Sequence, residues 1–144
     1  YNEVYSDGLV DNAIAELSDH LPQARVDLVR VPGAFEIPVT IKALLELEQP
    51  ICAIALGVII QGETAHADLV ARSVTDALQQ LALDYTTPVI HEVLLVADEA
   101  QAHVRCLGDE LNRGTEAARA ATAMVEIFSE LDRGRSLRTQ PRDA

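Results

Sequence analysis

The sequence predicts an α/β protein in which a parallel sheet lies between layers of helices. Short apolar, β-branched runs alternate along the chain with longer segments of helical periodicity, a pattern typical of parallel crossover units. The run ICAIALGVII (51–60) is apolar throughout, as expected of a strand covered on both faces. At 144 residues, the chain has the length of one domain.

The first element is an amphipathic helix over 4–20. Val10, Ile14 and Leu17 recur at helical spacing there. The segment RVDLVRV (25–31) is short, partly alternating and rich in valine, which predicts a strand.

A second helix is expected over 35–48, after the Pro32-Gly33 break. Ile37, Ile41 and Leu44 lie at helical spacing, and Pro38 is tolerated because it falls in the first turn. The apolar run described above then forms the next strand.

The second half repeats the alternation of helix and strand. Helical periodicity resumes over 66–84, and PVIHEVLLV (88–96) has the length and composition of a strand. Two further helices are expected, over 98–106 and 112–131. The polar remainder, 132–144, is expected to form a flexible tail.

These elements assign residues 1–131 to a single domain. Three strands are few for a doubly wound sheet, and Tyr1 leads directly into a helix. An N-terminal strand preceding Tyr1 is therefore expected to be absent from this chain.

Composition narrows the class of protein. The formal net charge of −12 opposes binding to nucleic acid, whose phosphates attract basic surfaces. No apolar run approaches the roughly 20 residues of a membrane helix, and the first residues do not resemble a signal peptide. Cys52 and Cys106 form no metal-binding motif, which favours two reduced thiols in a cytoplasmic protein.

The polar turns that follow the predicted strands are the candidate ligand sites. Ligands of open parallel sheets bind beyond the carboxyl ends of the strands. VPGAFEIP (31–38) and IIQGETAH (59–66) both place glycine turns before helices, whose N-termini attract anions. His66 is the imidazole best placed for proton transfer, although a histidine at a helix start is also common without any catalytic role.

Two arginines could supply positive charge to an anion in this acidic chain. Arg105 ends one predicted helix and Arg113 begins the next; they are either a phosphate clamp or ordinary solvated side chains. No Walker or GxGxxG motif is present. No metal site is expected, because His66 and Asp68, two apart on a helix, face different directions and no further ligand cluster accompanies them.

Five segments together resemble the lumazine synthase family of riboflavin biosynthesis. They occur in order over residues 1–128, without obvious gaps, and five motifs in register are far more specific than any one alone. The segments are VPGAFEIP (31–38), GVIIQGETAHADLV (57–70), PVIHEVLL (88–95), EAQAHVR (99–105) and NRGTEAA (112–118).

The resemblance implies a fold, a reaction and an assembly. The fold would be a flavodoxin-like three-layer α/β/α sandwich. The reaction would condense 5-amino-6-(D-ribitylamino)uracil with 3,4-dihydroxy-2-butanone 4-phosphate, with no cofactor and no metal. The assembly would be a homo-oligomer, at least a pentamer, with its sites between subunits. In many members of the family the pentamers form an icosahedral shell, and riboflavin synthase is a candidate partner.

The resemblance also implies a role for each matching residue. His66 would transfer protons, and Glu116 would orient it. Tyr1, Asn2 and His91 would contact the pyrimidine ring, and Ile59 and Ile60 its edge. The ribityl chain would be held by Ala34, Phe35 and Glu36. The phosphate would be bound by Gly62, Glu63, Thr64 and Arg105, with Arg113 as a further basic position.

Several positions depart from the family pattern. His91-Glu92 replaces a phenylalanine and a small residue, Arg113 replaces a lysine, and Gln61 replaces an arginine. Asp109 and Glu110 alter a loop that bears on how pentamers meet. These changes leave open a second interpretation, a shell-forming or flavin-binding paralogue with weak or no turnover. A flavodoxin-like electron carrier is disfavoured, because no phosphate loop of that type precedes the first helix.

Overall fold

The computed structural model describes the backbone of residues 3–139 and the side chains of residues 3–134. The α/β class is confirmed, with β1 and β2 alternating with helices as the sequence predicts. In chain order the elements are α1 (Glu3–His20), the 3₁₀ turn η1 (Ala34–Glu36), α2 (Ile37–Leu47), β1 (Ala53–Ile60), α3 (His66–Tyr85), β2 (Val89–Val96), α4 (Glu99–Leu107) and α5 (Arg113–Thr139).

The two strands are parallel neighbours joined by α3. Their register pairs Ala53 with Val89 at one end and Ile60 with Val96 at the other. Gln61 extends the ladder by one hydrogen bond, its N–H donating to the Val96 carbonyl at 2.8 Å. Both strands therefore end at the same edge of the sheet, where α3 and α4 begin.

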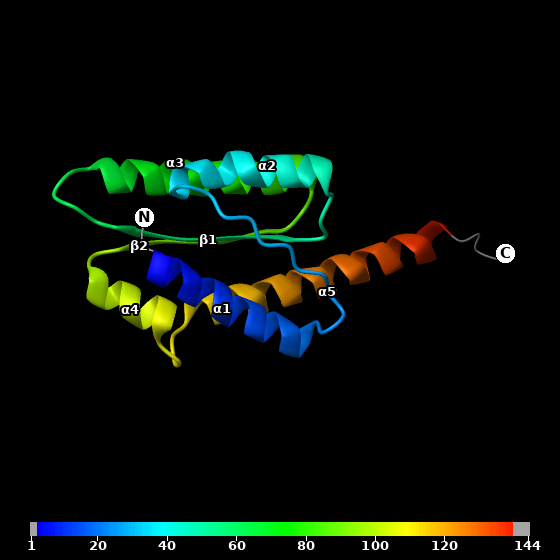
Figure 1. Cartoon of the computed structure of the whole chain (residues 1–144). Coiled ribbons are helices and arrows are strands. Elements are labelled where there is room, and N and C mark those ends of the chain that lie inside the picture. The colour runs from blue at the N-terminus through cyan, green and yellow to red at the C-terminus, as the bar shows by residue number, and fades with distance from the viewer. Residues whose placement is uncertain (1–2, 140–144) are drawn as a thin grey trace.

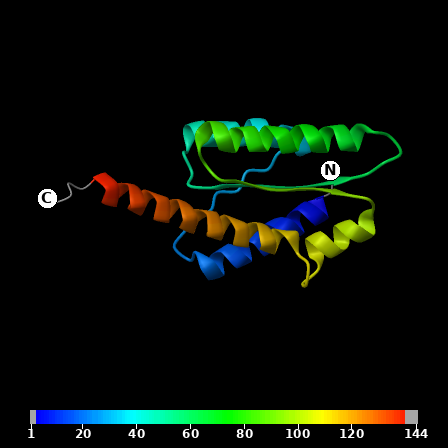
Figure 2. The same ribbon diagram turned by 180° about the vertical axis from the view of Figure 1, so that it is seen from behind.

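Helices cover both faces of the sheet, which gives the expected three layers (Figures 1 and 2). On one face, α2 and α3 pack Ile41, Val74 and Leu78 against Val93 of β2. On the other face lie α1, α4 and α5. There Leu9 of α1 packs near Leu94, Val96, Ala102 and Cys106, while Ala13 and Leu17 meet Ala118 and Ala121 of α5.

The prediction of a strand over 25–31 is wrong, because these residues form no strand. Among the residues that the structure describes, the sheet has two strands. The segment runs as an extended line beside the sheet (Figure 1), with Val26, Leu28 and Val29 each about half exposed. A strand requires a hydrogen-bonded neighbour, and side-chain composition cannot report whether one is present. The expected absence of an N-terminal strand remains a prediction.

The last helix continues beyond the expected end at residue 131, through Thr139 (Figures 1 and 2). Residues 132–139 contain no proline and only one glycine, so nothing in the local sequence terminates the helix. Polarity suggested a loose tail, but a helix that is already nucleated can extend into polar sequence without a buried face.

Candidate active site

The turn after β1 carries the first group of predicted site residues. Gly62, Glu63 and Thr64 are exposed and leave the sheet at its carboxyl edge. The Thr64 hydroxyl accepts a 3.4 Å hydrogen bond from the His66 N–H, and α3 begins at His66 itself. The residue before the helix, Ala65, makes no capping hydrogen bond with its side chain. The N-terminus of α3 therefore exposes its free backbone N–H groups and the positive end of its dipole to solvent.

His66 is exposed at the first position of α3, above the carboxyl edge of β1. Nearby, the Gln61 side-chain amide donates to Asp68 at 3.3 Å, which ties the end of the strand to the first turn of the helix. A Cβ added at Gly62 would meet no atom within 4 Å, so the glycine leaves open space beside the turn. A small anion could therefore approach this backbone closely.

The second group lies beside α2. Ala34, Phe35 and Glu36 form the 3₁₀ turn η1 after the Pro32-Gly33 break, and Phe35 is 63% exposed. A cavity of about 440 Å³ opens there between α2 and α3. Its lining residues are Phe35, Glu36, Pro38, Val39, Ser73, Val74 and Ala77. Ile59 and Ile60 are the last residues of β1 and are partly buried.

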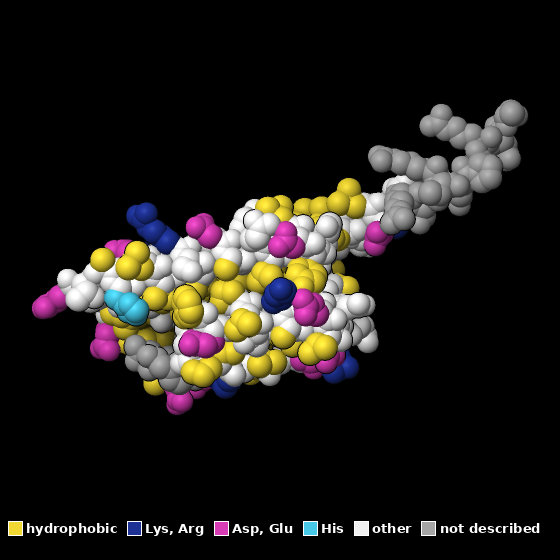
Figure 3. Space-filling view, turned by 90° about the horizontal axis from the view of Figure 1, so that it is seen from above, with side chains coloured by type: hydrophobic (Ala, Val, Ile, Leu, Met, Phe, Trp, Pro, Cys, Tyr) yellow, Lys and Arg dark blue, Asp and Glu magenta, His cyan; other side chains and the backbone are white. Residues whose placement is uncertain are grey.

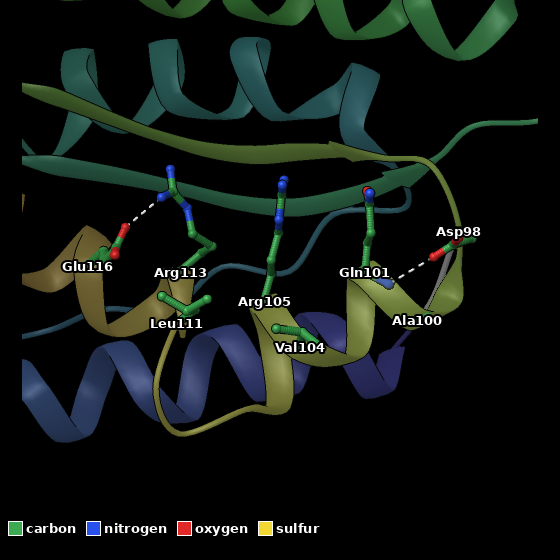
Figure 4. Close-up of a pocket in the computed structure, with 8 residues that line it drawn as sticks. All are labelled: Asp98, Ala100, Gln101, Val104, Arg105, Leu111, Arg113 and Glu116. Carbon is green, nitrogen blue, oxygen red and sulfur yellow. Dashed lines mark hydrogen bonds and ion pairs between the residues drawn. The ribbon is translucent and has the colours of Figure 1, made fainter.

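The two predicted arginines lie in one pocket, of about 650 Å³, between α4 and α5 (Figure 4). Gln101 and Arg105, on successive turns of α4, and Arg113, at the start of α5, point in the same direction. Asp98, Ala100, Val104, Leu111 and Glu116 complete the lining. Arg105 forms no ion pair with any residue that the structure describes, whereas Arg113 is held by two carboxylates.

Arg113 bridges β2 and α5. Its Nε donates to Glu92 at 3.2 Å, and its Nη1 donates to Glu116 at 2.6 Å. The Glu92 side chain is only 11% exposed. Burial raises the pKa of the Glu92 carboxyl, and the neighbouring Arg113 charge opposes part of that rise.

Asn112, which the motif analysis did not single out, fixes where Arg113 stands. Its Oδ1 accepts from the N–H groups of Gly114 and Thr115, at 2.9 and 3.1 Å, and so caps α5. Its side-chain amide donates to the carbonyls of Cys106 and Gly108 at the end of α4. Asparagine directly before a helical pattern is the signal that could have identified this cap.

Gln101 was also missed as a pocket residue. Its N–H donates to Asp98 at 2.9 Å, and its own side-chain oxygen accepts from the Ala97 N–H at 2.9 Å. Asp98 and Gln101 are three apart, the spacing of a capping box, and this spacing would have fixed the start of α4.

His91 lies on the opposite face of β2 from Glu92, because successive side chains of a strand alternate. Its Nδ1 accepts from the Val93 N–H at 3.0 Å, which assigns the proton to Nε2, 2.8 Å from the Thr75 hydroxyl. Burial lowers the pKa of the His91 imidazole. The ring is therefore held neutral against α3 and does not line the arginine pocket.

The predicted site residues thus fall into separate regions of the chain. The turn with His66 and the pocket with Arg105 do not share a cavity: neither the 650 Å³ pocket nor the 440 Å³ cavity is lined by His66. Glu116 is paired with Arg113 and not with His66. Tyr1 and Asn2 lie outside the described residues.

None of the helices in the described chain is long and apolar enough to cross a membrane. Among the side chains of residues 3–134, no group of three or more His, Cys, Asp and Glu residues could hold a metal ion. Cys52 and Cys106 are both free thiols, and burial raises the pKa of each to about 11.

Comparison with known proteins identifies the family. The sequence profile of 6,7-dimethyl-8-ribityllumazine synthase matches residues 1–129. The protein of that name from Thermococcus onnurineus is 40% identical over 91% of this chain and 85% of its own length. Those from Thermococcus kodakarensis and Bdellovibrio bacteriovorus are 37% and 38% identical over 91% of this chain, and over 83% and 72% of their own lengths. The chain therefore belongs to the 6,7-dimethyl-8-ribityllumazine synthase family, whose members are transferases.

Proposed function

We propose that the protein condenses 5-amino-6-(D-ribitylamino)uracil with 3,4-dihydroxy-2-butanone 4-phosphate to give 6,7-dimethyl-8-ribityllumazine, phosphate and water. The observation that carries the proposal is the uncapped start of α3, where Gly62 to Thr64 and His66 stand exposed at the carboxyl edge of the sheet. This edge is where ligands of parallel sheets bind, and a helix N-terminus favours a phosphate.

Phosphate is proposed to bind between the turn and Arg105. The backbone donors of Gly62, Glu63 and Thr64 would hold its oxygens from one side. Arg105, which has no carboxylate partner in the described chain, would add a bidentate guanidinium from the other. Arg113 is already engaged by two glutamates, so its contribution to the phosphate would be smaller.

The pyrimidine substrate is proposed to lie along the end of β1. The backbone of Ile59 and Ile60 would read the edge of the ring, and Ala34 to Glu36 would hold the ribityl chain. Tyr1 and Asn2 are proposed to complete the ring site. Because both ring nitrogens of His91 are hydrogen-bonded inside the chain, this residue could offer only a ring face or edge to the substrate.

The reaction needs positioning and proton transfer. The 5-amino group attacks the butanone carbonyl, and loss of water gives an imine. Elimination then breaks a C–O bond and releases phosphate. The resulting enol tautomerises to a ketone, and the ribitylamino nitrogen attacks its carbonyl with loss of a second water. Juxtaposing the two substrates can supply up to about 7–11 kcal/mol. His66 would move the protons, a role typically worth about 10²–10⁴-fold.

The complete site is proposed to form between copies of the chain, in a homo-oligomer that is at least a pentamer. The separation of His66 from the arginine pocket supports this, since a phosphate bound at the turn would need Arg105 from a neighbour. The exposed surface of α2 and α3 also carries apolar side chains (Figure 3), among them Val39, Leu69 and Leu83, each more than 60% exposed. We place the enzyme in the cytoplasm, with riboflavin synthase as a candidate partner and an icosahedral shell as a candidate higher assembly.

Mixing the purified full chain with both substrates tests the proposal directly. Fluorescent lumazine should form well above the rate of the same mixture without protein. The second candidate, a paralogue that binds flavin or lumazine without turnover, is favoured by the carboxylate of Glu92 beside Arg113. Tight binding of riboflavin with no synthesis would select it over the enzyme.

A further inference from the structure

The two arginines of the pocket differ in how much of their charge is already compensated. Arg105 leaves α4 without an ion pair in the described chain, whereas Arg113 is bound at Nε by Glu92 and at Nη1 by Glu116. Figure 4 shows Arg105 standing between Gln101 and Arg113, with the guanidinium of Arg113 turned toward Glu116. An anion entering this pocket must therefore compete with two carboxylates for Arg113.

Glu92 approaches Arg113 from the protein interior. It projects from β2 and is nearly buried, so its position is set by the strand and not by a flexible surface rotamer. Arg113 is the first residue of α5, where the helix dipole disfavours a cation, and the two carboxylates offset that cost. The contact at Nε restricts rotation of the planar guanidinium, because Nε is the nitrogen that joins this group to the rest of the side chain.

We propose that Glu92 is a positioning residue that restrains Arg113 and thereby weakens phosphate binding in the arginine pocket. This rests on the proposed function, which makes phosphate the leaving group. With Glu92 and Glu116 both engaged, Arg113 can share only part of its charge with a bound anion. Phosphate is then held chiefly through Arg105 and dissociates readily after elimination.

The charges around the pocket agree with this role. Arg105 and Arg113 are the cationic side chains, and Glu92, Glu116 and Asp98 are the acidic ones. The three acids outnumber the two arginines, so the pocket has no net positive charge. A doubly charged phosphate is therefore attracted only weakly. Replacing Glu92 by glutamine equalises the two numbers, and the glutamine oxygen can still accept a hydrogen bond from Arg113 Nε.

The test is binding of inorganic phosphate to the full chain, measured by calorimetry. Glu92→Gln should bind phosphate about five- to tenfold more tightly than wild type, because Arg113 no longer shares its charge with the Glu92 carboxylate and can give more of it to the anion. In the synthase assay, the same variant should show stronger product inhibition by phosphate and a lower KM for the butanone phosphate. A lower affinity for phosphate, or no change, would overturn the proposal.

Glu16→Gln provides the matched control. Glu16 also accepts from an arginine Nε, that of Arg119 at 3.0 Å, and its side chain is also mostly buried, at 17% exposed. It joins α1 to α5 away from the arginine pocket, so its neutralisation should leave phosphate affinity within about twofold. An equal gain in both variants would show a general effect of net charge and contradict the role of Glu92.

A second background tests whether Glu92 acts through Arg113. In Arg113→Gln the further change Glu92→Gln should alter phosphate affinity less than about twofold, since the restrained cation is gone. If Arg113→Gln fails to fold, Arg113→Met serves instead, because methionine keeps an unbranched side chain of similar length and carries no charge. A full five- to tenfold effect in either background would refute the positioning role.

These measurements separate the inference from the proposed function. Phosphate binding needs no turnover, so a wild-type protein that makes no lumazine could still show the Glu92 effect. Conversely, an active synthase whose phosphate affinity ignores Glu92→Gln would retain the function and lose the inference.

Discussion

Individual side chains in this protein divide into exposed groups that are free to meet a ligand and groups already satisfied within the chain. His66 and Arg105 are exposed and belong to the first kind. His91, Glu92 and Arg113 belong to the second, since each is hydrogen-bonded by neighbours on other elements. The first group can meet a ligand with its full hydrogen-bonding capacity, whereas the second has part of that capacity already used within the chain.

Replacing His66 by alanine should lower kcat by about 10²-fold, the low end of the range for acid–base catalysis, because juxtaposition of the substrates contributes most of the acceleration. Steady-state kinetics of His66→Ala would measure this, with binding of phosphate checked separately. Complete loss of turnover with normal phosphate binding would contradict the view that proximity dominates.

His91 should make stability depend on pH. Its pKa in the folded protein lies below the ordinary value of 6.5 because burial disfavours the charged ring, so the unfolded chain binds more protons in that range. Unfolding free energy should therefore fall as pH drops below about 6.5 and level off below the folded pKa. The raised pKa of Glu92 acts in the opposite direction, chiefly above its ordinary value of 4.5.

Comparison of wild type with His91→Gln separates the pH dependence that His91 contributes from the pH dependence that Glu92 contributes. Urea unfolding at several pH values should show that the wild type loses more stability than the variant as the medium is acidified from pH 7. Parallel curves for the two proteins would show that His91 is not held neutral.

At the scale of elements, α5 is positioned by close backbone contact as well as by its cap. Gly114 lies against the carbonyl oxygen of Leu9 in α1, and a Cβ there would overlap it. The hydrogen bonds of Asn112 join the start of α5 to the end of α4. They hold the two helices that carry the arginine pocket in a fixed arrangement. Small residues at this crossing allow two helices to approach closely beneath the sheet.

Two glycines of the same helix should therefore respond oppositely to alanine. Gly114→Ala should destabilise the fold by about 1–3 kcal/mol, because the backbone of α1 must shift. At Gly134 a Cβ meets nothing within 4 Å, so Gly134→Ala should stabilise by up to about 1 kcal/mol through helix propensity. Denaturant titration gives both values, and a stabilising Gly114→Ala would contradict the close packing described.

At the scale of the whole molecule, one chain carries the two halves of the proposed site in different places. In the proposed assembly, the turn at His66 of one copy meets the pocket at Arg105 of a neighbouring copy, since the two do not share a cavity within one chain. Exposed apolar side chains on α2 and α3 are consistent with a covered surface in the assembled protein (Figure 3).

Multi-angle light scattering should therefore give a mass of at least five chains, and activity should be lost on dilution into monomers. Pentamer, decamer and sixty-mer differ so widely in mass that one measurement distinguishes them. An active monomer would contradict the proposed sharing of Arg105 between copies.

The sequence alone determined the α/β class, the helices, the two central strands and the placing of His66 at a strand end. Periodicity and apolar runs record which faces are buried, and these faces follow from local side-chain order. The motifs also indicated the family, which the comparisons confirmed.

Only the tertiary structure decided which residues are partners. The segment 25–31 has strand composition but no hydrogen-bonded neighbour among the described residues, and Arg113 is paired with Glu92 from 21 positions away. Such contacts depend on how elements pack, and local sequence does not encode the neighbour. Sequence therefore identified the groups available for chemistry, while packing determined which of them are already neutralised within the chain.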